Sequence, residues 1–247
     1  MEEIFKKEIL INSFDVDLNN RLRLDQLFRY IQQMAYEHSE KLNFGYEFLL
    51  DKNIIWVLSR ILIQMERYPM WNDKIVIETW PRKLKRLFAV RDFIIYDLDN
   101  NIIGKATSYW LMLDIKNNRP VRIGKKFVNF KYLDKKIGID KDLKKIKKSG
   151  ELKKVYSGQV NYTDLDQNKH VNNARYIEWI LNSFNIDYFN KYKIKNLQAN
   201  FLKEMNINTN YVIQKSSAGK LEKTLIVKNP DTDEKSFASQ VKFQNNP

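Results

Sequence analysis

Cysteine is absent from this 247-residue sequence, and histidine occurs only twice, at His38 and His170. The lack of cysteine excludes disulfides, thiolate metal ligands, iron–sulfur ligation and a cysteine nucleophile. Two histidines are too few for a His-rich metal site. We therefore expect neither a metal nor a cofactor.

Long apolar runs are missing as well. The longest is about five residues, at 54–58, whereas a membrane-spanning helix needs roughly 20. Residues 1–7 begin with acids and lack the apolar core of a signal peptide. We expect no membrane span and a cytoplasmic location.

The sequence does contain enough apolar material for a sizeable core. Apolar residues make up 43% of the chain and aromatic residues 13%, which excludes a disordered chain. The length allows one large domain or two smaller ones.

Positive charge is concentrated in one stretch. The chain has a net charge of +13, and residues 116–154 alone carry 15 Lys and Arg against four Asp and Glu, a net +11. This stretch is either a solvated linker or a docking face for an acidic partner. Nucleic acid is not expected, because no binding motif accompanies the charge and few of the bases are Arg.

The first half predicts one helix followed by four strands. Apolar residues at spacings of three and four mark one helix face over residues 24–42. His38 lies on this face, and we expect it to be packed in the core. Runs of β-branched and aromatic residues then predict four strands, at 54–65, 74–80, 87–96 and 102–113.

A similar order returns after a linker-like region at 141–150. A strand-like run at 155–162 and a polar loop precede a helix predicted from the apolar face at 174–188. Four strand-like runs follow, at 197–202, 211–214, 224–227 and 237–243.

This shared order indicates an internal duplication, and an Arg-Tyr-Ile echo at 29–31 and 175–177 sets its offset at 146 residues. We expect an α+β fold in which each repeat wraps an antiparallel sheet around a long helix. The predicted segments are 1–130, a basic linker at 131–150, and 151–247.

Residues 164–173 combine two acids, four amides and a histidine just before the second helix. One interpretation is a polar capping loop, because Asn and Asp favour turns and caps. The other is a catalytic site, in which free amides of the helix start stabilise an oxyanion and His170 moves protons. Asp166 and Asn168 could then orient His170 or a water. A metal site is not expected, because a convincing ligand set is missing.

The first repeat provides an internal comparison. At the 146-residue offset, the positions of Asp166, Asn168 and His170 are occupied by Asn20, Leu22 and Leu24. The first half would thus lack the histidine and its amide partner. We expect the chemistry in the second half and an apolar ligand in the first.

Residues 164–181, DLDQNKHVNNARYIEWIL, closely resemble the signature segment of the acyl-acyl carrier protein (acyl-ACP) thioesterases. The resemblance extends over roughly residues 5–245 and implies a double hotdog fold. It also implies hydrolysis of the thioester of fatty acyl-ACP, which releases free fatty acid and holo-ACP and terminates chain elongation. Further matches, in the family's order and approximate spacing, are IWVLSR at 55–60, YPxWxD at 68–73, ETW at 78–80, RD at 91–92 and SxW at 108–110.

The resemblance implies four catalytic residues. Asp166, Asn168 and His170 match the family's Asp-x-Asn-x-His positions, and Glu204, on the next strand, matches its glutamate. Met205 stands where plant members often have Cys, so a thiolate nucleophile is excluded. Glu204 is then either the base or the nucleophile.

The implied partners are an acidic, phosphopantetheine-bearing acyl carrier protein and a fatty acyl chain, with the acyl pocket in the first half. Alternatives are an acyl-coenzyme A (acyl-CoA) thioesterase and a non-catalytic hotdog protein that binds acyl groups or carrier protein. The sequence does not fix the oligomeric state, for which a homodimer is one expectation. It also leaves the preferred acyl chain open.

Overall fold

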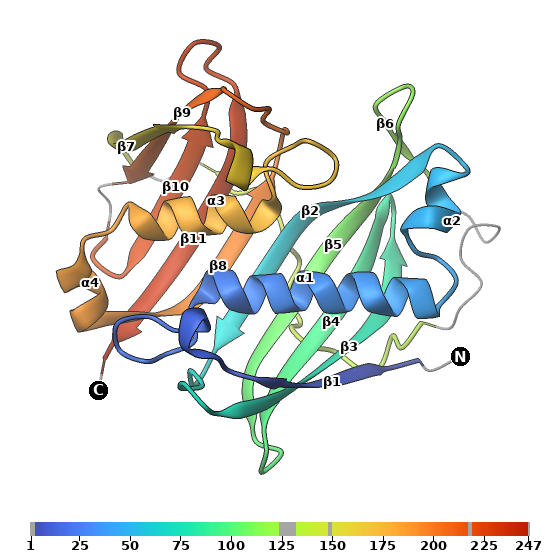
Figure 1. Cartoon of the computed structure of the whole chain (residues 1–247), viewed down its shortest axis with the longest axis horizontal. Helices are drawn as coiled ribbons and strands as arrows, with labels where there is room; N and C mark the ends of the chain where they lie inside the picture. Colours follow the sequence, from blue (N-terminus) through green and yellow to red (C-terminus); the bar gives the residue numbers. More distant parts are fainter. Residues whose placement is uncertain (1–2, 124–131, 148–149, 217–218, 247) are drawn as a thin grey trace. The chain divides into compact units, whose positions relative to one another are not determined.

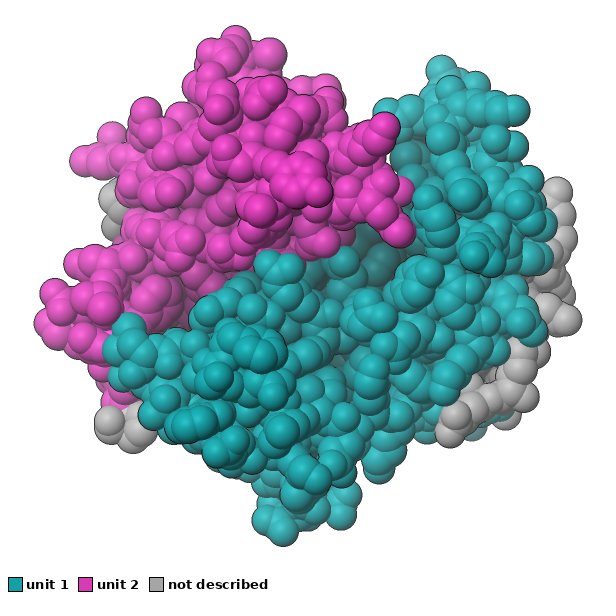
Figure 2. All heavy atoms as spheres, viewed as in Figure 1, with its two compact units in different colours: residues 1–143 teal, residues 144–247 magenta. Residues whose placement is uncertain are grey.

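The computed structural model describes residues 3–123, 132–147, 150–216 and 219–246. Two compact units divide the chain, unit 1 over Met1–Leu143 and unit 2 over Lys144–Pro247. Figure 2 colours them separately. The expected boundary at 130/131 and the pair Lys125-Lys126 lie outside the described residues.

Unit 1 is an antiparallel sheet with a long helix. The strand order is β1-β3-β4-β5-β2, and β6 pairs with β5. The elements are β1 (Phe5–Leu10), the 3-10 helix η1 (Ser13–Asp15), α1 (Leu24–Lys41), α2 (Tyr46–Leu50), β2 (Ile54–Met65), β3 (Lys74–Lys85), β4 (Phe88–Asp97), β5 (Ile102–Asp114) and β6 (Arg119–Val121).

The helix α1 lies across one face of this sheet (Figure 1). Its apolar stripe is buried, with Leu27, Phe28 and Ile31 all at most 1% exposed. Burying such a stripe removes apolar surface from water, which is the main favourable term in folding. His38 is 1% exposed and stacks on Phe5 with ring centroids 5.7 Å apart. It is therefore confirmed as a core histidine.

Residues 133–143, expected as part of a linker, pack on the sheet of unit 1. Ile139 and Leu143 are buried against apolar side chains of β2, β4 and β5. The backbone amide of Gly138 donates to buried Asp92 at 2.9 Å, and a Cβ on Gly138 would lie 3.1 Å from the Asp92 Cβ. Glycine permits this close approach.

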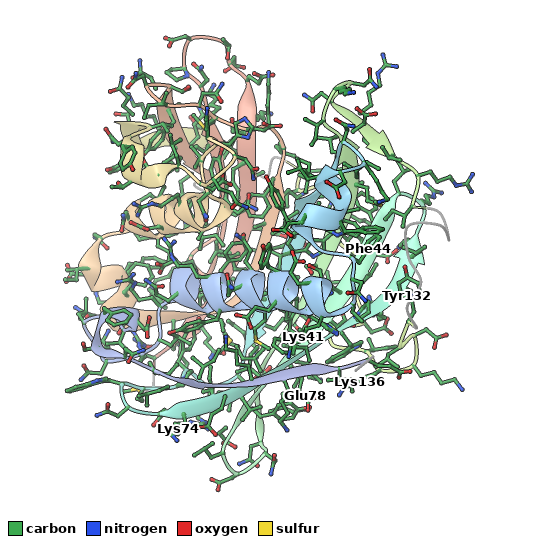
Figure 3. The ribbon with its side chains drawn as sticks, turned by 45° about the vertical axis from the view of Figure 1, so that its right-hand side comes forward. Lys41, Phe44, Lys74, Glu78, Tyr132 and Lys136 are labelled. Atoms are coloured by element: carbon green, nitrogen blue, oxygen red, sulfur yellow. The ribbon has the colours of Figure 1, made fainter. Side chains whose placement is uncertain are left out.

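Several lysines of the same stretch are on the surface. Lys136 is only partly exposed and pairs with Glu78 of β3 at 2.7 Å (Figure 3). Lys141, Lys144 and Lys145 are exposed. The basic stretch thus has an inward apolar side and an outward cationic side, although residues 124–131 and 148–149 lie outside the described part.

Unit 2 repeats the arrangement on a smaller scale, with strand order β8-β11-β10-β9-β7 and α3 against its sheet (Figure 1). Its elements are β7 (Leu152–Gln159), the 3-10 helix η3 (Tyr162–Asp164), α3 (Asn173–Asn182), α4 (Ile186–Lys191), β8 (Tyr192–Phe201), β9 (Asn210–Ser216), β10 (Glu222–Lys228) and β11 (Lys235–Asn245).

The single helix expected over 174–188 is two helices. α3 ends at Asn182, with Ser183 as its C-cap, and Asn185 caps α4 by accepting a hydrogen bond from the Tyr188 amide at 3.0 Å. The apolar spacing continues across this break, so periodicity alone did not reveal it. The α+β fold with a duplicated helix-and-sheet unit is confirmed. Within the described ranges, no helix is long and apolar enough to cross a membrane.

Candidate active site

The polar segment identified in the sequence lies in the loop of residues 160–172, between β7 and α3. Asp164 fixes the shape of this loop, because it is buried and accepts the Asn161 amide at 2.8 Å. Its carbonyl oxygen accepts the Asn172 amide at 2.8 Å, and its carboxylate pairs with Arg175 of α3 at 3.2 Å. The side chain of Asn172 caps α3 by accepting from Ala174.

Asp166 holds the tip of the loop in a tight turn. Its Oδ1 accepts the backbone amides of Asn168 at 2.8 Å and of His170 at 3.5 Å. Its own amide donates to the carbonyl of His170 at 2.8 Å. Lys169 adopts the left-handed conformation that the turn requires, with φ of 64°.

His170 and Glu204 meet at the base of this turn. The Nε2 atom of His170 lies 2.9 Å from Oε2 of Glu204, and the two side chains are 39% and 46% exposed. Glu204 follows the end of β8 at Phe201 rather than lying within the strand. The Val171 amide donates to the carbonyl of Met205 at 3.0 Å, which joins the segment after β8 to the loop and brings the pair together.

The side chain of Asn168 does not join this pair. It is exposed, and among the described residues it forms no hydrogen bond to His170 or Glu204. Of the four predicted residues, the structure therefore brings His170 and Glu204 into contact, and Asp166 touches the backbone of His170. The Asn168 amide can turn toward a ligand at the loop surface.

The expected oxyanion amides at the helix start are already used. The amides of Val171 and Asn172 donate to Met205 and Asp164, and that of Ala174 donates to the Asn172 side chain at 2.9 Å. The expectation concerned the amides after Val171. Those of Asn172 and Ala174 cannot also stabilise an oxyanion without breaking these internal bonds, so the expectation is wrong for these two.

One residue near the pair was not singled out from the sequence. Tyr176 of α3 is 3% exposed. Burial raises the pKa of its hydroxyl, the charge of Glu204 raises it further, the Met205 backbone amide lowers it, and Asp166 also raises it. A tyrosine on an apolar helix face cannot be told from a packed core ring by spacing, which is why the pattern gave no signal.

Unit 1 contains a loop of the same geometry at residues 11–23. Oδ1 of Asp17 accepts the amides of Asn19 at 2.8 Å and of Arg21 at 3.1 Å. Asn20 has φ of 58°, like Lys169 in the other loop. These matches, and the bridges Val16–Leu22 and Leu165–Val171, set the structural offset at 149 residues.

The offset of 146 residues is therefore wrong. At 149, Asp166, Asn168 and His170 correspond to Asp17, Asn19 and Arg21 instead of Asn20, Leu22 and Leu24. The first half still lacks the histidine, but it retains the asparagine side-chain amide, at Asn19. The Arg-Tyr-Ile echo misled the alignment because it is a chance identity three residues out of register.

The described parts of the two units contain no obvious metal-binding site. No group of three or more His, Cys, Asp or Glu side chains gathers there in a way that could hold an ion.

Fold and site together define a class of protein: a duplicated helix-and-sheet protein in which a histidine on the loop before the helix of the second unit contacts a glutamate that follows a strand of the same unit. The chain belongs to the acyl-ACP thioesterase family. The N-terminal domain of that family matches residues 2–130 and its C-terminal domain matches residues 147–245.

Curated relatives include an oleoyl-acyl carrier protein thioesterase and a palmitoyl-acyl carrier protein thioesterase, both chloroplastic and from Arabidopsis thaliana. They are 28% and 24% identical over 81% of this chain. The matched region covers 59% and 52% of those proteins, so the chain spans little more than half of their length.

Solved structures match over nearly the whole chain. An acyl-ACP thioesterase from Bacteroides thetaiotaomicron superposes with a TM-score of 0.87 and 27% identity, covering 98% of both chains. The 12:0-ACP thioesterase from Umbellularia californica gives a TM-score of 0.86 at 18% identity, covering 100% of this chain and 99% of that one, which supports the fold alone. The double hotdog fold is thereby confirmed.

Proposed function

We propose that this protein hydrolyses the thioester of fatty acyl-ACP, releasing free fatty acid and holo-ACP and so terminating chain elongation. Membership of the thioesterase family supports the reaction type, and the relatives named as acting on acyl-ACP support the substrate class. The observation that carries the proposal is the 2.9 Å contact between His170 and Glu204. This contact joins His170 of the motif-bearing loop to the carboxylate of Glu204 after β8, which supports a role of the pair in proton transfer.

In the proposed reaction Glu204 is the base or the nucleophile, and the two routes give the same products. As a base, Glu204 takes a proton from water while the water oxygen attacks the acyl carbon. As a nucleophile, its carboxylate attacks that carbon, and water then hydrolyses the resulting anhydride. In both routes the carbon–sulfur bond breaks, and the sulfur leaves with the electron pair.

His170 is proposed to carry a proton to the leaving sulfur, because imidazole titrates near neutral pH. The thiolate is a fair leaving group, with an ordinary pKa of about 8.5. Asp166 is proposed to keep His170 in place through the turn that its carboxylate holds. Asn168 is proposed to donate its side-chain amide to the oxyanion or the attacking water, a use supported by its exposed position on the loop.

The proposed partner is an acidic acyl carrier protein, and the basic stretch supports this choice. The surface lysines Lys141, Lys144 and Lys145 belong to a segment of net charge +11. Opposite charges accelerate encounter and lose effect as salt rises. A cytoplasmic location and an acyl pocket formed mainly by the first half are part of the same proposal.

A hydrolysis screen tests the function. Purified protein is offered acyl-ACP and acyl-CoA series of graded chain length, and thiol release is followed at low and near-physiological salt. The proposal expects faster turnover of acyl-ACP, with a salt-dependent kcat/KM. Equal or better turnover of acyl-CoA, insensitive to salt, would favour an acyl-CoA thioesterase, and binding without turnover would favour a non-catalytic binding protein.

A further inference from the structure

Three of the motifs that the chain shares with the family meet around Arg91 in unit 1. Thr79 of the ETW motif, Arg91 of the RD motif and Ser108 of the SxW motif lie on the adjacent strands β3, β4 and β5. The hydroxyl of Ser108 donates to the carbonyl of Arg91 at 3.2 Å, and the indole nitrogen of Trp110 donates to the Ser108 hydroxyl at 2.8 Å. The proposed reaction uses none of these residues.

The guanidinium of Arg91 is buried between the sheet and α1. Its Nη1 atom donates to the hydroxyl oxygen of Thr79 at 3.2 Å and lies 2.9 Å from Nδ1 of His38. A guanidinium can only donate, so Nδ1 of His38 is the acceptor and the imidazole is neutral. Arg91 is 9% exposed, and His38 and Thr79 are at most 1% exposed. A cation thus lies among buried neutral groups.

Arg91 has no carboxylate partner in the described part of the chain. Both of its side-chain hydrogen bonds use Nη1, so among the described residues Nε and Nη2 have no acceptor. Burial lowers the pKa of its guanidinium to about 10, which still leaves it protonated at neutral pH. A buried charge without a counter-ion destabilises a folded protein.

Arg82 of the neighbouring strand shows how the same sheet balances another buried cation. It is 3% exposed and pairs with the buried carboxylate of Asp92 at 3.2 Å. Asp92 follows Arg91 in the chain, so its side chain points to the opposite face of the strand, where it accepts the amide of Gly138. The carboxylate of Asp92 is therefore engaged and faces away from Arg91.

The side chains next to this cluster are apolar. Ile31 and Met34 precede His38 by seven and four residues on the same face of α1, and both are 1% exposed. Phe93 follows Arg91 by two residues on the same face of β4 and is 0% exposed. A ligand that suits this interior combines an anionic head with an aliphatic tail.

We propose that the Nε–Nη2 edge of Arg91 binds the carboxylate of a free fatty acid in the interior of unit 1. A guanidinium edge and a carboxylate can form two parallel hydrogen bonds, which gives the buried cation its missing counter-ion. No covalent bond forms or breaks. Because the same interior is proposed to hold the acyl chain, bound fatty acid competes with acyl-ACP. This competition rests on the proposed function, whereas the binding does not.

Dodecanoate and dodecanol test the binding, because they share a chain and differ in the head group. Each is titrated calorimetrically into the purified full-length protein below its micelle or solubility limit. The wild type should bind dodecanoate at least about tenfold more tightly, the size of effect typical of a hydrogen bond to a charged group. Arg91→Met keeps an apolar stem and removes the guanidinium, so it should bind the two probes about equally. Its Tm should stay the same or rise, because an uncompensated buried charge is gone.

Arg67→Met is the matched control. Arg67 is a cation of the same unit, but its side chain is 52% exposed and pairs with Asp97 at 2.5 Å. This variant should keep the wild-type preference for dodecanoate, which separates a specific subsite from general attraction to a basic protein. With acyl-ACP as substrate, dodecanoate should inhibit the wild type competitively and Arg91→Met at least about tenfold more weakly.

An absence of binding, or equal affinity of the wild type for dodecanoate and dodecanol, would overturn the inference, and this comparison needs no variant. An unchanged preference in Arg91→Met, or an equal loss in Arg67→Met, would overturn it too. Binding through Arg91 without competition would overturn the competition alone. A wild-type protein that binds dodecanoate through Arg91 but hydrolyses no acyl-ACP would overturn the proposed function and leave the binding site standing.

Discussion

Replacing His170 and Glu204 with alanine, singly and together, tests whether the pair acts as one unit. Each side chain is the other's direct partner at 2.9 Å, so removing either leaves the remaining group without its proton donor or acceptor. General acid–base steps typically contribute about 10²–10⁴ in rate. Each single variant should therefore lose at least about 10² in kcat, equivalent to roughly 2.7 kcal/mol of transition-state stabilisation.

The double variant should be little slower than either single one, because residues that act as a unit have non-additive effects. Stability should change little in comparison. The two side chains are 39% and 46% exposed, and ion pairs near the surface contribute about 0–1 kcal/mol. The variants should thus remain folded, and a loss of rate can be assigned to the chemistry.

The lack of cysteine makes the assay direct. A thiol reagent reads the phosphopantetheine thiol released from acyl-ACP with no background from the enzyme, which has no thiol of its own. Glu234→Ala is the control, since it removes a carboxylate that pairs with Lys203 at 2.5 Å in the same unit, and should retain full activity. Full activity in either single variant, or strictly multiplicative losses in the double variant, would refute the reasoning.

Three further predictions concern the acyl pocket, the carrier protein and the pH dependence of stability. Replacing buried Met34 of α1 with a larger or smaller apolar residue should shift the preferred chain length, and an unchanged product profile in folded variants would contradict this. Lys144→Glu with Lys145→Glu should raise KM for acyl-ACP and weaken its salt dependence, while acyl-CoA turnover stays constant. Lys136→Met should lower the free energy of unfolding by up to about 1 kcal/mol at pH 7. Burial raises the pKa of Glu78, but the Lys136 contact and a second lysine lower it to below 4.5 overall. The pair's contribution should therefore fade as the pH falls below about 4.5, which urea unfolding from pH 3 to 8 would detect.

Periodicity predicted those elements that have one buried face. The helix at 24–42 and the strand at 54–65 agree with α1 and β2 to within one residue, because apolar side chains recur at the period of each element. The break between α3 and α4 was missed because it is set by local capping at Ser183 and Asn185. The strand β3 continues through Pro81 by a shift in register, whereas the sequence prediction ended the strand before it.

The candidate site was only partly predictable. Loop composition indicated His170, but it could not place Glu204, which lies 34 positions further along the chain and was found only through the family resemblance. Tyr176 gave no signal because a tyrosine on the apolar face of a helix has the same spacing as any packed core residue. Short spacings can reveal a loop, whereas a contact that closes through tertiary structure needs the coordinates.

The two loops separate the scaffold of the site from its chemistry. In both, an aspartate accepts the same pair of backbone amides, and the residue after the turn donates its amide to a carbonyl from another segment: Leu22 to Pro69 at 2.8 Å, and Val171 to Met205 at 3.0 Å. The residue that precedes the accepting residue in the sequence is Tyr68 in unit 1 and Glu204 in unit 2.

The turn therefore forms without a histidine, and its shape cannot be what makes unit 2 a candidate for catalysis. In unit 1, Arg21 forms an ion pair with Asp17 at 3.2 Å, and the charges of both act on Tyr68. Arginine stays protonated across the physiological range, so it cannot exchange a proton as His170 can. Two positions, Arg21 against His170 and Tyr68 against Glu204, thus distinguish a loop without acid–base chemistry from the one that we propose to be catalytic.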